Sequence, residues 1–287
     1  MTRDGLPFPL PAKRRTLAAL ILASGTPTAS AQQAALQFGV MPNVSARILL
    51  QQYQPFRLFL EQELSRPVEI VTAPGLQAFQ ERSLAGAYGV VVTAANLGRV
   101  AQLDGGLRPI AIYEPRIPGL IVTCKSRPLE QATQLTGLTV AMANPQSLVA
   151  LKFIQWLRGE GLELGGDVTA VHARNEDSLA QLLATGEARA AVMSRGEFNA
   201  IRTDIRETLA IWREFIRVPG FLVLLGRGIS DADAARIEPA LARFPQSEAG
   251  RTFFAATGFN GIRPVTPADL AELDDVVAET RNFLRAR

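Results

Sequence analysis

The stretch from residue 138 to residue 162, LTVAMANPQSLVALKFIQWLRGEGL, constrains the fold of this chain more than any other. It opens with a short apolar run at residues 139–143 and continues, after a polar interruption, with apolar side chains that recur at helical spacing. These side chains are Val149, Phe153, Trp156 and Leu157. The pattern predicts a buried strand, a tight corner and an amphipathic helix.

The corner itself reads Asn144-Pro145-Gln146-Ser147. Ser147 is a good helix N-cap, and Pro145 stiffens the entry to the helix. The N–H groups at a helix start have no partner inside the helix, so this corner could hold an anion or a polar ligand group. The alternative is an ordinary capped crossover helix that binds nothing.

The same construction recurs along the chain, which favours an α/β fold with largely parallel sheets. Before the central stretch, strands are predicted at residues 36–41, 68–72, 88–92, 107–113 and 119–124. After it, strands are predicted at residues 168–172 and 188–193, with a helix at 176–185 between them.

Two long apolar runs flank the central block. Residues 110–124 are interrupted at 114–119, and residues 215–225 are broken at Pro219-Gly220. They suggest two strands that pass from one lobe to the other and back.

Helices are predicted around and after these runs. Pro55 is expected to divide the first helical segment in two, because the residue before a proline is pushed out of the helical region. The end of the chain is predicted to be helical over residues 231–244, 247–256 and 267–284.

Residues 1–31 have the features of an export signal. Lys13, Arg14 and Arg15 precede a short apolar run at residues 17–23, and Ala29-Ser30-Ala31 is a small-residue cleavage site. The run is too short to span a bilayer, so cleavage after Ala31 and a periplasmic location are expected. Arg14-Arg15 leaves the twin-arginine route open beside the general secretory route. A basic tail on a cytoplasmic protein is the alternative.

The net positive charge of the chain comes from that segment. Removing Arg3, Lys13, Arg14, Arg15 and Asp4 takes the 30 basic and 27 acidic side chains to 26 and 26, a net charge of zero. A neutral chain without a basic run gives no electrostatic reason to expect a nucleic acid or an anionic membrane as partner.

Catalytic and metal-binding patterns are not found in the sequence. The single cysteine, Cys124, and the single histidine, His172, both lie in strand-like runs, so a buried thiol and a structural histidine are expected. No nucleophile–base pair, metal-ligand cluster or phosphate loop is present. We therefore expect no cofactor and no enzymatic activity.

Four segments together resemble a known family. They are GVMPNVSARILLQQYQPFRLFLEQEL, IVTAPGLQAFQERSLAGAYGVVVTAAN, LTGLTVAMANPQSLVALKFIQWLRGEGL and EDSLAQLLATGEARAAVMSR. The framework, which includes Gly39-x-x-Pro42 and the L-x-G-x-x-V-A run at residues 135–141, is similar to the phosphate/phosphite/phosphonate-binding proteins of ABC transporters.

The resemblance implies a two-lobed type II periplasmic binding protein fold, in which each lobe is a mainly parallel sheet flanked by helices and two crossing strands join the lobes. Residues 34–118 and 220–287 would form lobe 1, and residues 119–219 would form lobe 2. The implied partners are a small-molecule ligand and the membrane permease of an ABC importer, with the binding protein a monomer.

The ligand motifs depart from the family pattern. The family's D-P-x-S-T-S-G corner reads Asn144-Pro145-Gln146-Ser147-Leu148-Val149-Ala150, so one hydroxyl remains. The family's Gly-Pro-x-x-Tyr becomes residues 93–97, TAANL, and its Ser-His-Asp becomes Asn175-Glu176-Asp177. A glutamate in place of an oxyanion-binding histidine disfavours an anionic ligand. We therefore expect this chain to share the fold of the family but not its phosphonate specificity.

Candidate ligand-binding residues lie at the predicted carboxyl ends of strands, where ligands of open α/β sheets bind. They are Asn43, Ser45, Thr93, Asn96, Tyr113, Asn144, Ser147, Asn175, Glu176 and Ser194. The set suits a small polar, anionic or zwitterionic ligand, with Glu176 as a partner for an amine. Several of these residues are also ordinary turn and cap residues. An extracytoplasmic sensing or interaction module of the same fold, acting with a sensor protein, is the alternative function.

Overall fold

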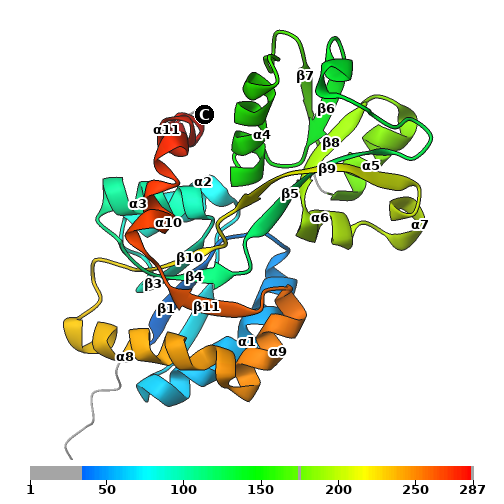
Figure 1. Ribbon diagram of the computed structural model, residues 1–287. Helices are drawn as coiled ribbons and strands as arrows, with labels where there is room; N and C mark the ends of the chain where they lie inside the picture. Colours follow the sequence, from blue (N-terminus) through cyan, green and yellow to red (C-terminus); the bar gives the residue numbers. More distant parts are fainter. Residues whose placement is uncertain (1–33, 174–175, 286–287) are drawn as a thin grey trace, which may run out of the picture. The chain divides into compact units, whose positions relative to one another are not determined.

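The computed structural model describes residues 34–173 and 176–285. The predicted export signal and Asn175 lie outside these ranges. The described chain is an α/β structure with two sheets, each flanked by helices (Figure 1). No helix within these ranges combines the length and the apolar character that a membrane span requires.

The first sheet has six strands in the order β11-β4-β10-β3-β1-β2. Parallel pairing joins β1 to β2 and to β3, whereas β10 and β11 pair antiparallel with their neighbours. The strands are β1 (Leu36–Val40), β2 (Val68–Val71), β3 (Val90–Thr93), β4 (Arg108–Glu114), β10 (Leu222–Leu225) and β11 (Gly261–Pro264).

The second sheet has five strands in the order β7-β6-β8-β5-β9. Its core is parallel, with β6 between β7 and β8, and β5 pairs antiparallel with β8 and β9. The strands are β5 (Ile117–Cys124), β6 (Thr139–Met142), β7 (Thr169–His172), β8 (Ala190–Ser194) and β9 (Leu209–Val218).

The sheets are mixed rather than mainly parallel. The reason is the pair of crossing connections, which the sequence predicts correctly. The chain leaves the first sheet after β4 and enters the second as β5, then leaves as β9 and returns as β10. These strands run against their neighbours, so each parallel core acquires antiparallel strands.

Helices cover both faces of the first sheet (Figure 1). One face packs against α1 (Ala46–Leu64), α8 (Asp231–Arg243) and α9 (Glu248–Thr257). The other packs against α2 (Leu76–Leu84) and α3 (Ala95–Gly105). Val90 and Val92 face the first group and Val91 the second, as expected for alternating strand residues.

The second sheet is covered in the same way. The helix α4 (Leu148–Gly159) packs on one face, and α5 (Glu176–Thr185) with α6 (Arg195–Ala200) packs on the other. The short elements α7 (Thr203–Arg206) and η1 (Ala132–Leu135) complete this part of the chain. The cluster under α4 is continuous with the cluster under α2 and α3, so apolar packing links the two sheets on this side.

The predicted division of the first helical segment at Pro55 is wrong. The helix α1 is continuous over Ala46–Leu64, with Pro55 inside it. Its buried residues Leu49, Tyr53, Phe56, Leu60 and Leu64 form one stripe across the proline. Burying large apolar side chains contributes about 1.5 to 3 kcal/mol each, which together exceeds the cost of about 3 kcal/mol for an interior proline.

The end of the chain also differs from the prediction. In place of one helix over residues 267–284, the structure has α10 (Pro267–Ala271), η3 (Asp274–Val276) and α11 (Val277–Arg285). The interruption buries Leu273 and Val276 completely. Tertiary packing therefore determines where this helix breaks.

Two strand segments were not predicted. β11 is a four-residue strand that begins with glycine and ends with proline, and it forms because it pairs with β4. β9 begins at Leu209 rather than residue 215, because pairing along β5 extends it through the charged residues Arg213 and Glu214.

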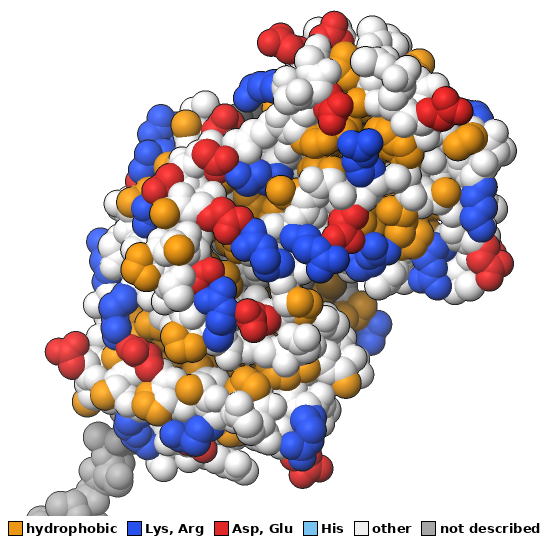
Figure 2. Space-filling view, in the orientation of Figure 1, with side chains coloured by type: hydrophobic (Ala, Val, Ile, Leu, Met, Phe, Trp, Pro, Cys, Tyr) orange, Lys and Arg blue, Asp and Glu red, His pale blue; other side chains and the backbone are white. Residues whose placement is uncertain are grey.

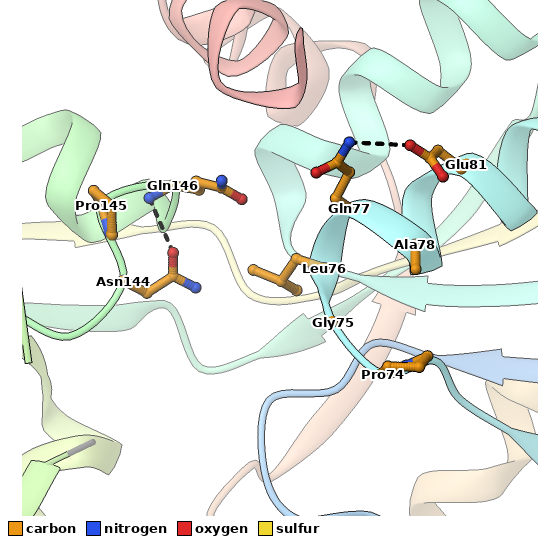
Figure 3. Close-up of a pocket in the computed structure, with 9 residues that line it drawn as sticks. All are labelled: Pro74, Gly75, Leu76, Gln77, Ala78, Glu81, Asn144, Pro145 and Gln146. Atoms are coloured by element: carbon orange, nitrogen blue, oxygen red, sulfur yellow. Dashed lines mark hydrogen bonds between the residues drawn. The ribbon is translucent and has the colours of Figure 1, made fainter. Parts of the chain in front are cut away.

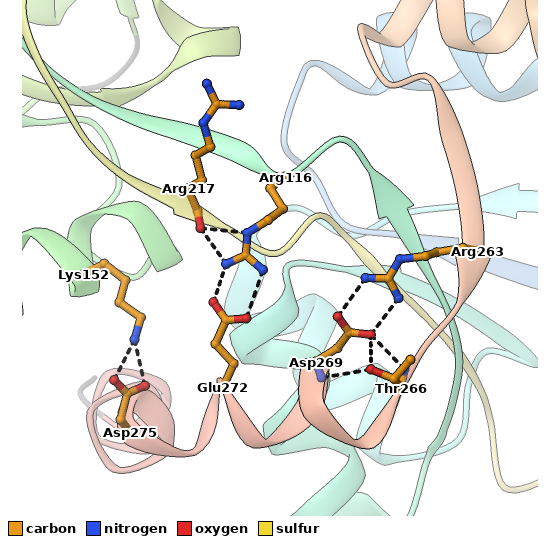
Figure 4. Close-up of polar contacts among 8 residues, drawn as sticks. All are labelled: Arg116, Lys152, Arg217, Arg263, Thr266, Asp269, Glu272 and Asp275. Carbon is orange, nitrogen blue, oxygen red and sulfur yellow. Dashed lines mark hydrogen bonds and ion pairs between the residues drawn. The ribbon is translucent and has the colours of Figure 1, made fainter.

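A buried carboxylate fixes the start of the C-terminal segment (Figure 4). Asp269 accepts hydrogen bonds from Arg263 Nη1 at 2.7 Å and Nη2 at 2.8 Å, and from the Thr266 backbone N–H at 2.8 Å. Arg263 Nε also donates to Glu114 at 2.8 Å. The bonds from Arg263 hold the pKa of Asp269 well below its ordinary value, although burial opposes this shift.

The same segment makes polar contacts with residues outside the first sheet. Asp275 accepts from Lys152 of α4 at 2.6 Å, and Glu272 pairs with Arg116 near the start of β5. Figure 4 shows these contacts side by side. Elsewhere on the face shown in Figure 2, Lys and Arg side chains are interspersed with Asp and Glu.

Candidate functional site

A pocket of about 560 Å³ lies between a corner of the first sheet and a corner of the second (Figure 3). The first corner joins β2 to α2, and the second joins β6 to α4. Both corners lie at the carboxyl ends of parallel strands, where α/β folds bind ligands. The lining residues are Pro74, Gly75, Leu76, Gln77, Ala78, Glu81, Asn144, Pro145 and Gln146.

The corner between β6 and α4 has the structure that the sequence predicts. Asn144 Oδ1 accepts from the Gln146 backbone N–H at 2.9 Å, and the Asn144 carbonyl accepts from the Ser147 N–H at 3.1 Å. Ser147 Oγ then caps α4 by accepting from the Ala150 N–H at 3.1 Å. Because the side-chain oxygen of Asn144 accepts the hydrogen bond in the turn, the side-chain NH2 group remains available as a donor.

The corner between β2 and α2 contributes most of the lining, yet none of the predicted site residues lies in it. Gly75 is the N-cap of α2 in an extended conformation, and no side chain caps the helix. In the first intrahelical hydrogen bond of α2, the Phe79 N–H donates to the Gly75 carbonyl at 3.0 Å. The N–H groups of Leu76, Gln77 and Ala78 therefore have no intrahelical acceptor and give the pocket a donor end.

The signal for this corner is present in the sequence. The predicted strand at 68–72 is followed by Pro74-Gly75 and then by a helix, which is the same strand-to-helix construction as at Asn144. Gly75 carries no side chain, so the positions of polar side chains at strand ends do not reveal this corner.

Within residues 34–173 and 176–285, Glu81 is the single charged residue that lines the pocket. It lies one turn after Gln77 on the same face of α2, and Gln77 Nε2 donates to Glu81 Oε1 at 3.1 Å. Figure 3 shows both side chains on the α2 wall, with Asn144, Pro145 and Gln146 opposite. The pocket thus combines a donor end at the helix start with a negative charge one turn along.

Asn96 connects α3 to the pocket wall. Its side chain is 1% exposed, and its Nδ2 donates to the Gln146 carbonyl at 3.2 Å and lies 3.2 Å from Thr280 Oγ1. The structure therefore brings the predicted residues Asn96 and Asn144 to one place. Thr93, at the end of β3, is completely buried.

Buried polar atoms without a partner gather in this part of the fold. Within the described ranges, the buried side-chain oxygens that lack a hydrogen bond are Thr72 Oγ1, Gln80 Oε1, Tyr88 OH, Thr93 Oγ1 and Asn96 Oδ1. All of them belong to the segment from the end of β2 to the start of α3. An unpaired buried polar group costs about 1 to 3 kcal/mol. None of these five residues is among those that line the pocket.

Tyr113 lies in the aromatic core and is not among the residues that line the pocket. It is 1% exposed, and its hydroxyl is 3.4 Å from that of Tyr53. Burial raises the pKa of Tyr113 well above its ordinary value, and the charge and hydrogen bond of Tyr53 raise it further.

The remaining predicted residues lie at other helix starts. Ser45 caps α1 by accepting from the Ile48 N–H, and Asn43 is exposed just before it. Ser194 caps α6, accepting from the Glu197 N–H at 3.2 Å. Glu176 begins α5. None of these residues lines the pocket, and their contact with a ligand remains a prediction.

The structure offers no metal centre within the described residues, because no three His, Cys, Asp or Glu side chains are grouped there. Cys124 is a buried thiol, as predicted, and its Sγ lies 3.3 Å from the Leu183 carbonyl. His172 is exposed at the end of β7.

Comparison with known proteins identifies the family. The family described as "ABC transporter, phosphonate, periplasmic substrate-binding protein" matches residues 38–270. The chain belongs to this family. The resemblance read from the four sequence segments is thereby confirmed, and the family is one of binding proteins rather than of enzymes.

Solved structures share the fold at low sequence identity. A Xanthomonas citri protein with bound chloride has a TM-score of 0.74 at 17% identity, covering 87% of this chain and 99% of that one. PhnD1 from Prochlorococcus marinus in complex with methylphosphonate has a TM-score of 0.74 at 12% identity, covering 86% and 98%.

A sensor domain has the same fold at a lower score. This histidine kinase sensor domain, described as similar to periplasmic binding proteins, has a TM-score of 0.53 at 15% identity, covering 79% and 96%. These likenesses confirm the two-lobed type II periplasmic binding fold. A search of curated proteins by sequence found no match.

Proposed function

We propose that this protein is the exported solute-binding subunit of an ABC importer, with its signal cleaved after Ala31. It binds a small polar ligand between its two sheets and delivers that ligand to a membrane permease, acting as a monomer and without catalysis. The pocket shared by the corner at Gly75 and the corner at Asn144 carries this proposal. A ligand there contacts both lobes, so binding favours the closed arrangement that a permease recognises.

The residues proposed to meet the ligand extend beyond the pocket lining. Asn144 lines the pocket, Asn96 donates to the carbonyl of the lining residue Gln146, and Ser147 caps the helix that follows. Asn43, Ser45, Asn175, Glu176 and Ser194 complete the proposed set. Thr93 and Tyr113, which are also predicted from the sequence, are buried.

We expect methylphosphonate and inorganic phosphate to bind with dissociation constants above 1 mM, an affinity of about −4 kcal/mol or weaker. Among the residues that the structure describes, no Lys, Arg or His lines the pocket, whereas Glu81 does. A dianion would therefore meet repulsion in place of a compensating charge. Isothermal titration calorimetry measures this directly, and micromolar binding of either anion would contradict it.

Thermal unfolding tests the proposed function itself. The purified protein is heated with phosphonates, phosphate, amino acids, amines, carboxylates or nucleobases. A ligand at a hundredfold excess over its dissociation constant adds about 2.7 kcal/mol to the free energy of unfolding, which raises Tm by several degrees. A compound that does so supports a solute-binding role. A well-folded protein whose Tm responds to no compound would overturn it.

The second candidate function is an extracytoplasmic sensing or interaction module. The replacement of the family's anion-binding motifs at Asn144 and at Glu176 favours it. In this role the cleft would serve a protein partner such as a sensor kinase. The absence of any thermal shift would move the assignment to this alternative.

A further inference from the structure

We propose that the C-terminal segment, residues 267–285, forms a polar latch between the two sheets. The latch consists of the contacts that two of its carboxylates, Glu272 and Asp275, make with residues of the second sheet and of α4. In the ligand-free protein these contacts hold the second sheet in the arrangement seen here. Releasing them frees the second sheet to move about the crossing strands, a motion that requires no ligand.

The covalent connections between the two sheets are two short links. The first is Pro115-Arg116, between β4 and β5, and the second is residues 219–221, between β9 and β10. A few residues at the ends of elements are enough to absorb the rotation in a hinge motion. Noncovalent contacts between the two sides therefore decide which arrangement is populated.

The C-terminal segment is fixed to the first sheet and its helices on both sides of the two carboxylates. At its start, Asp269 accepts from Arg263 of β11 at 2.7 and 2.8 Å. Near its end, Arg281 Nε donates to Asp104 of α3 at 3.0 Å. Both β11 and α3 belong to the first sheet and its cover, so the carboxylates between these two anchors are presented from that side.

Glu272 binds the first covalent link (Figure 4). Its carboxylate accepts from Arg116 Nη1 at 2.9 Å and also from Nη2. The same guanidinium donates to the Arg217 carbonyl, from Nε at 3.0 Å and from Nη2 at 2.6 Å. Arg217 is the last residue but one of β9. One side chain, Arg116, therefore joins both crossing strands to the C-terminal segment.

Asp275 binds α4, the helix that packs on the second sheet. Its carboxylate accepts from Lys152 Nζ at 2.6 and 2.8 Å, and its backbone carbonyl accepts from Gln155 Nε2 at 3.3 Å. The Lys152 side chain is only 12% exposed, although lysine is usually among the most exposed residues. Lys152 therefore gives up hydration for a carboxylate that it meets only while α4 lies against η3.

These contacts should affect the arrangement of the sheets more than the stability of the fold. Ion pairs between partly exposed side chains contribute little to the free energy of unfolding, because solvent screens them. An equilibrium between two arrangements of similar free energy responds to the same small contribution with a change of several-fold in population. The latch should therefore be visible in the distance between the sheets while Tm hardly changes.

Pulsed electron–electron double resonance of the purified, ligand-free protein measures that distance. Spin labels are attached at Gln181→Cys on α5 of the second sheet and at Thr252→Cys on α9 of the first, both exposed positions. Cys124 is buried, so it stays unlabelled. With the latch intact, we expect one narrow distribution of distances between the labels.

The variant Lys152→Gln/Glu272→Gln removes one charge from each contact. The population outside the narrow peak should rise at least threefold. Lys125→Gln/Glu130→Gln, the same pair of changes at two exposed positions, should leave the distribution unchanged. Thermal unfolding of both variants verifies that they fold. A distribution that is the same in the latch variant as in the parent protein would overturn the inference, as would a broad distribution in the parent itself.

A charge exchange separates the ion pair from the packing around it. Lys152→Glu places two carboxylates together and should broaden the distribution. Lys152→Glu combined with Asp275→Lys forms the pair in the reverse order and should restore at least half of the narrow peak. If the exchange restores nothing, the ion pair does not hold α4 against the C-terminal segment, and the latch is refuted.

Discussion

Phe56→Ala should lower the free energy of unfolding by about 3 to 5 kcal/mol, which corresponds to a fall in Tm of roughly 10 °C. Phe56 is completely buried in α1. Its ring centroid is 4.2 Å from that of Phe244, 5.1 Å from Phe38 and 5.6 Å from Phe253. The truncation removes these contacts and leaves a cavity, which the neighbouring rings from three different elements cannot fill without a shift of those elements.

Leu58→Ala is the matched control for this variant. Leu58 is two residues along the same helix and 45% exposed, so its truncation should change the unfolding free energy by less than about 0.5 kcal/mol. Chemical denaturation of both variants measures the difference. Equal effects would show that the aromatic cluster around Phe56 does not hold α1 against the sheet.

Asp269→Asn should lower the free energy of unfolding by about 2 kcal/mol at pH 7. The substitution keeps the shape of the side chain and removes the charge that accepts from Arg263 and Thr266. The Asp269 side chain is 11% exposed and that of Arg263 is 37% exposed, so solvent screens the pair only in part. Arg263 links α10 to β11 and, through Glu114, to the end of β4.

The effect of this substitution should depend on pH. The pKa of Asp269 lies below its ordinary value of about 3.8, chiefly because Arg263 bonds its charged form. A group with a lowered pKa contributes stability above its unfolded value and loses it as the pH falls toward the folded value. The gap between wild type and Asp269→Asn should therefore be constant from pH 7 to about pH 5 and shrink below about pH 4.

Asp204→Asn provides the control for charge removal. Asp204 pairs with Arg202, and both side chains are about two-thirds exposed, at 65% and 66%. No measurable change in Tm is expected at any of these pH values. A gap for Asp269→Asn that persists unchanged at pH 3, or that is absent at pH 7, would contradict the role given to its carboxylate.

The fold is predictable from the sequence wherever apolar periodicity and capping residues agree. Ser147 at the start of α4 and the helix at residues 176–185 are examples, and both match the structure. Prediction fails where tertiary contacts override the local signal. Pro55 remains inside α1 because the buried stripe spans it, and β11 forms only because β4 offers it an edge.

The site was predictable in part. Asn144 lines the pocket and Asn96 bonds its wall, as expected of polar residues at strand ends. The corner at Gly75 was missed because backbone N–H groups, rather than a side chain, supply its chemistry. Tyr113 is the last residue of a strand predicted from the sequence, yet its ring completes the aromatic core beside Tyr53.

Blocking the pocket tests the central claim most directly, that the space between α2 and residues 144–146 is the ligand site. Gln77 is exposed on the pocket wall, so Gln77→Trp should fill the pocket while leaving the fold intact. Gln181→Trp places the same bulk on an exposed position of α5, outside the pocket. Thermal unfolding of both variants against the full panel of compounds is the measurement. Any compound that raises the Tm of wild type should raise the Tm of Gln181→Trp equally and should leave the Tm of Gln77→Trp unchanged. A Tm shift in Gln77→Trp as large as in wild type would place the ligand elsewhere.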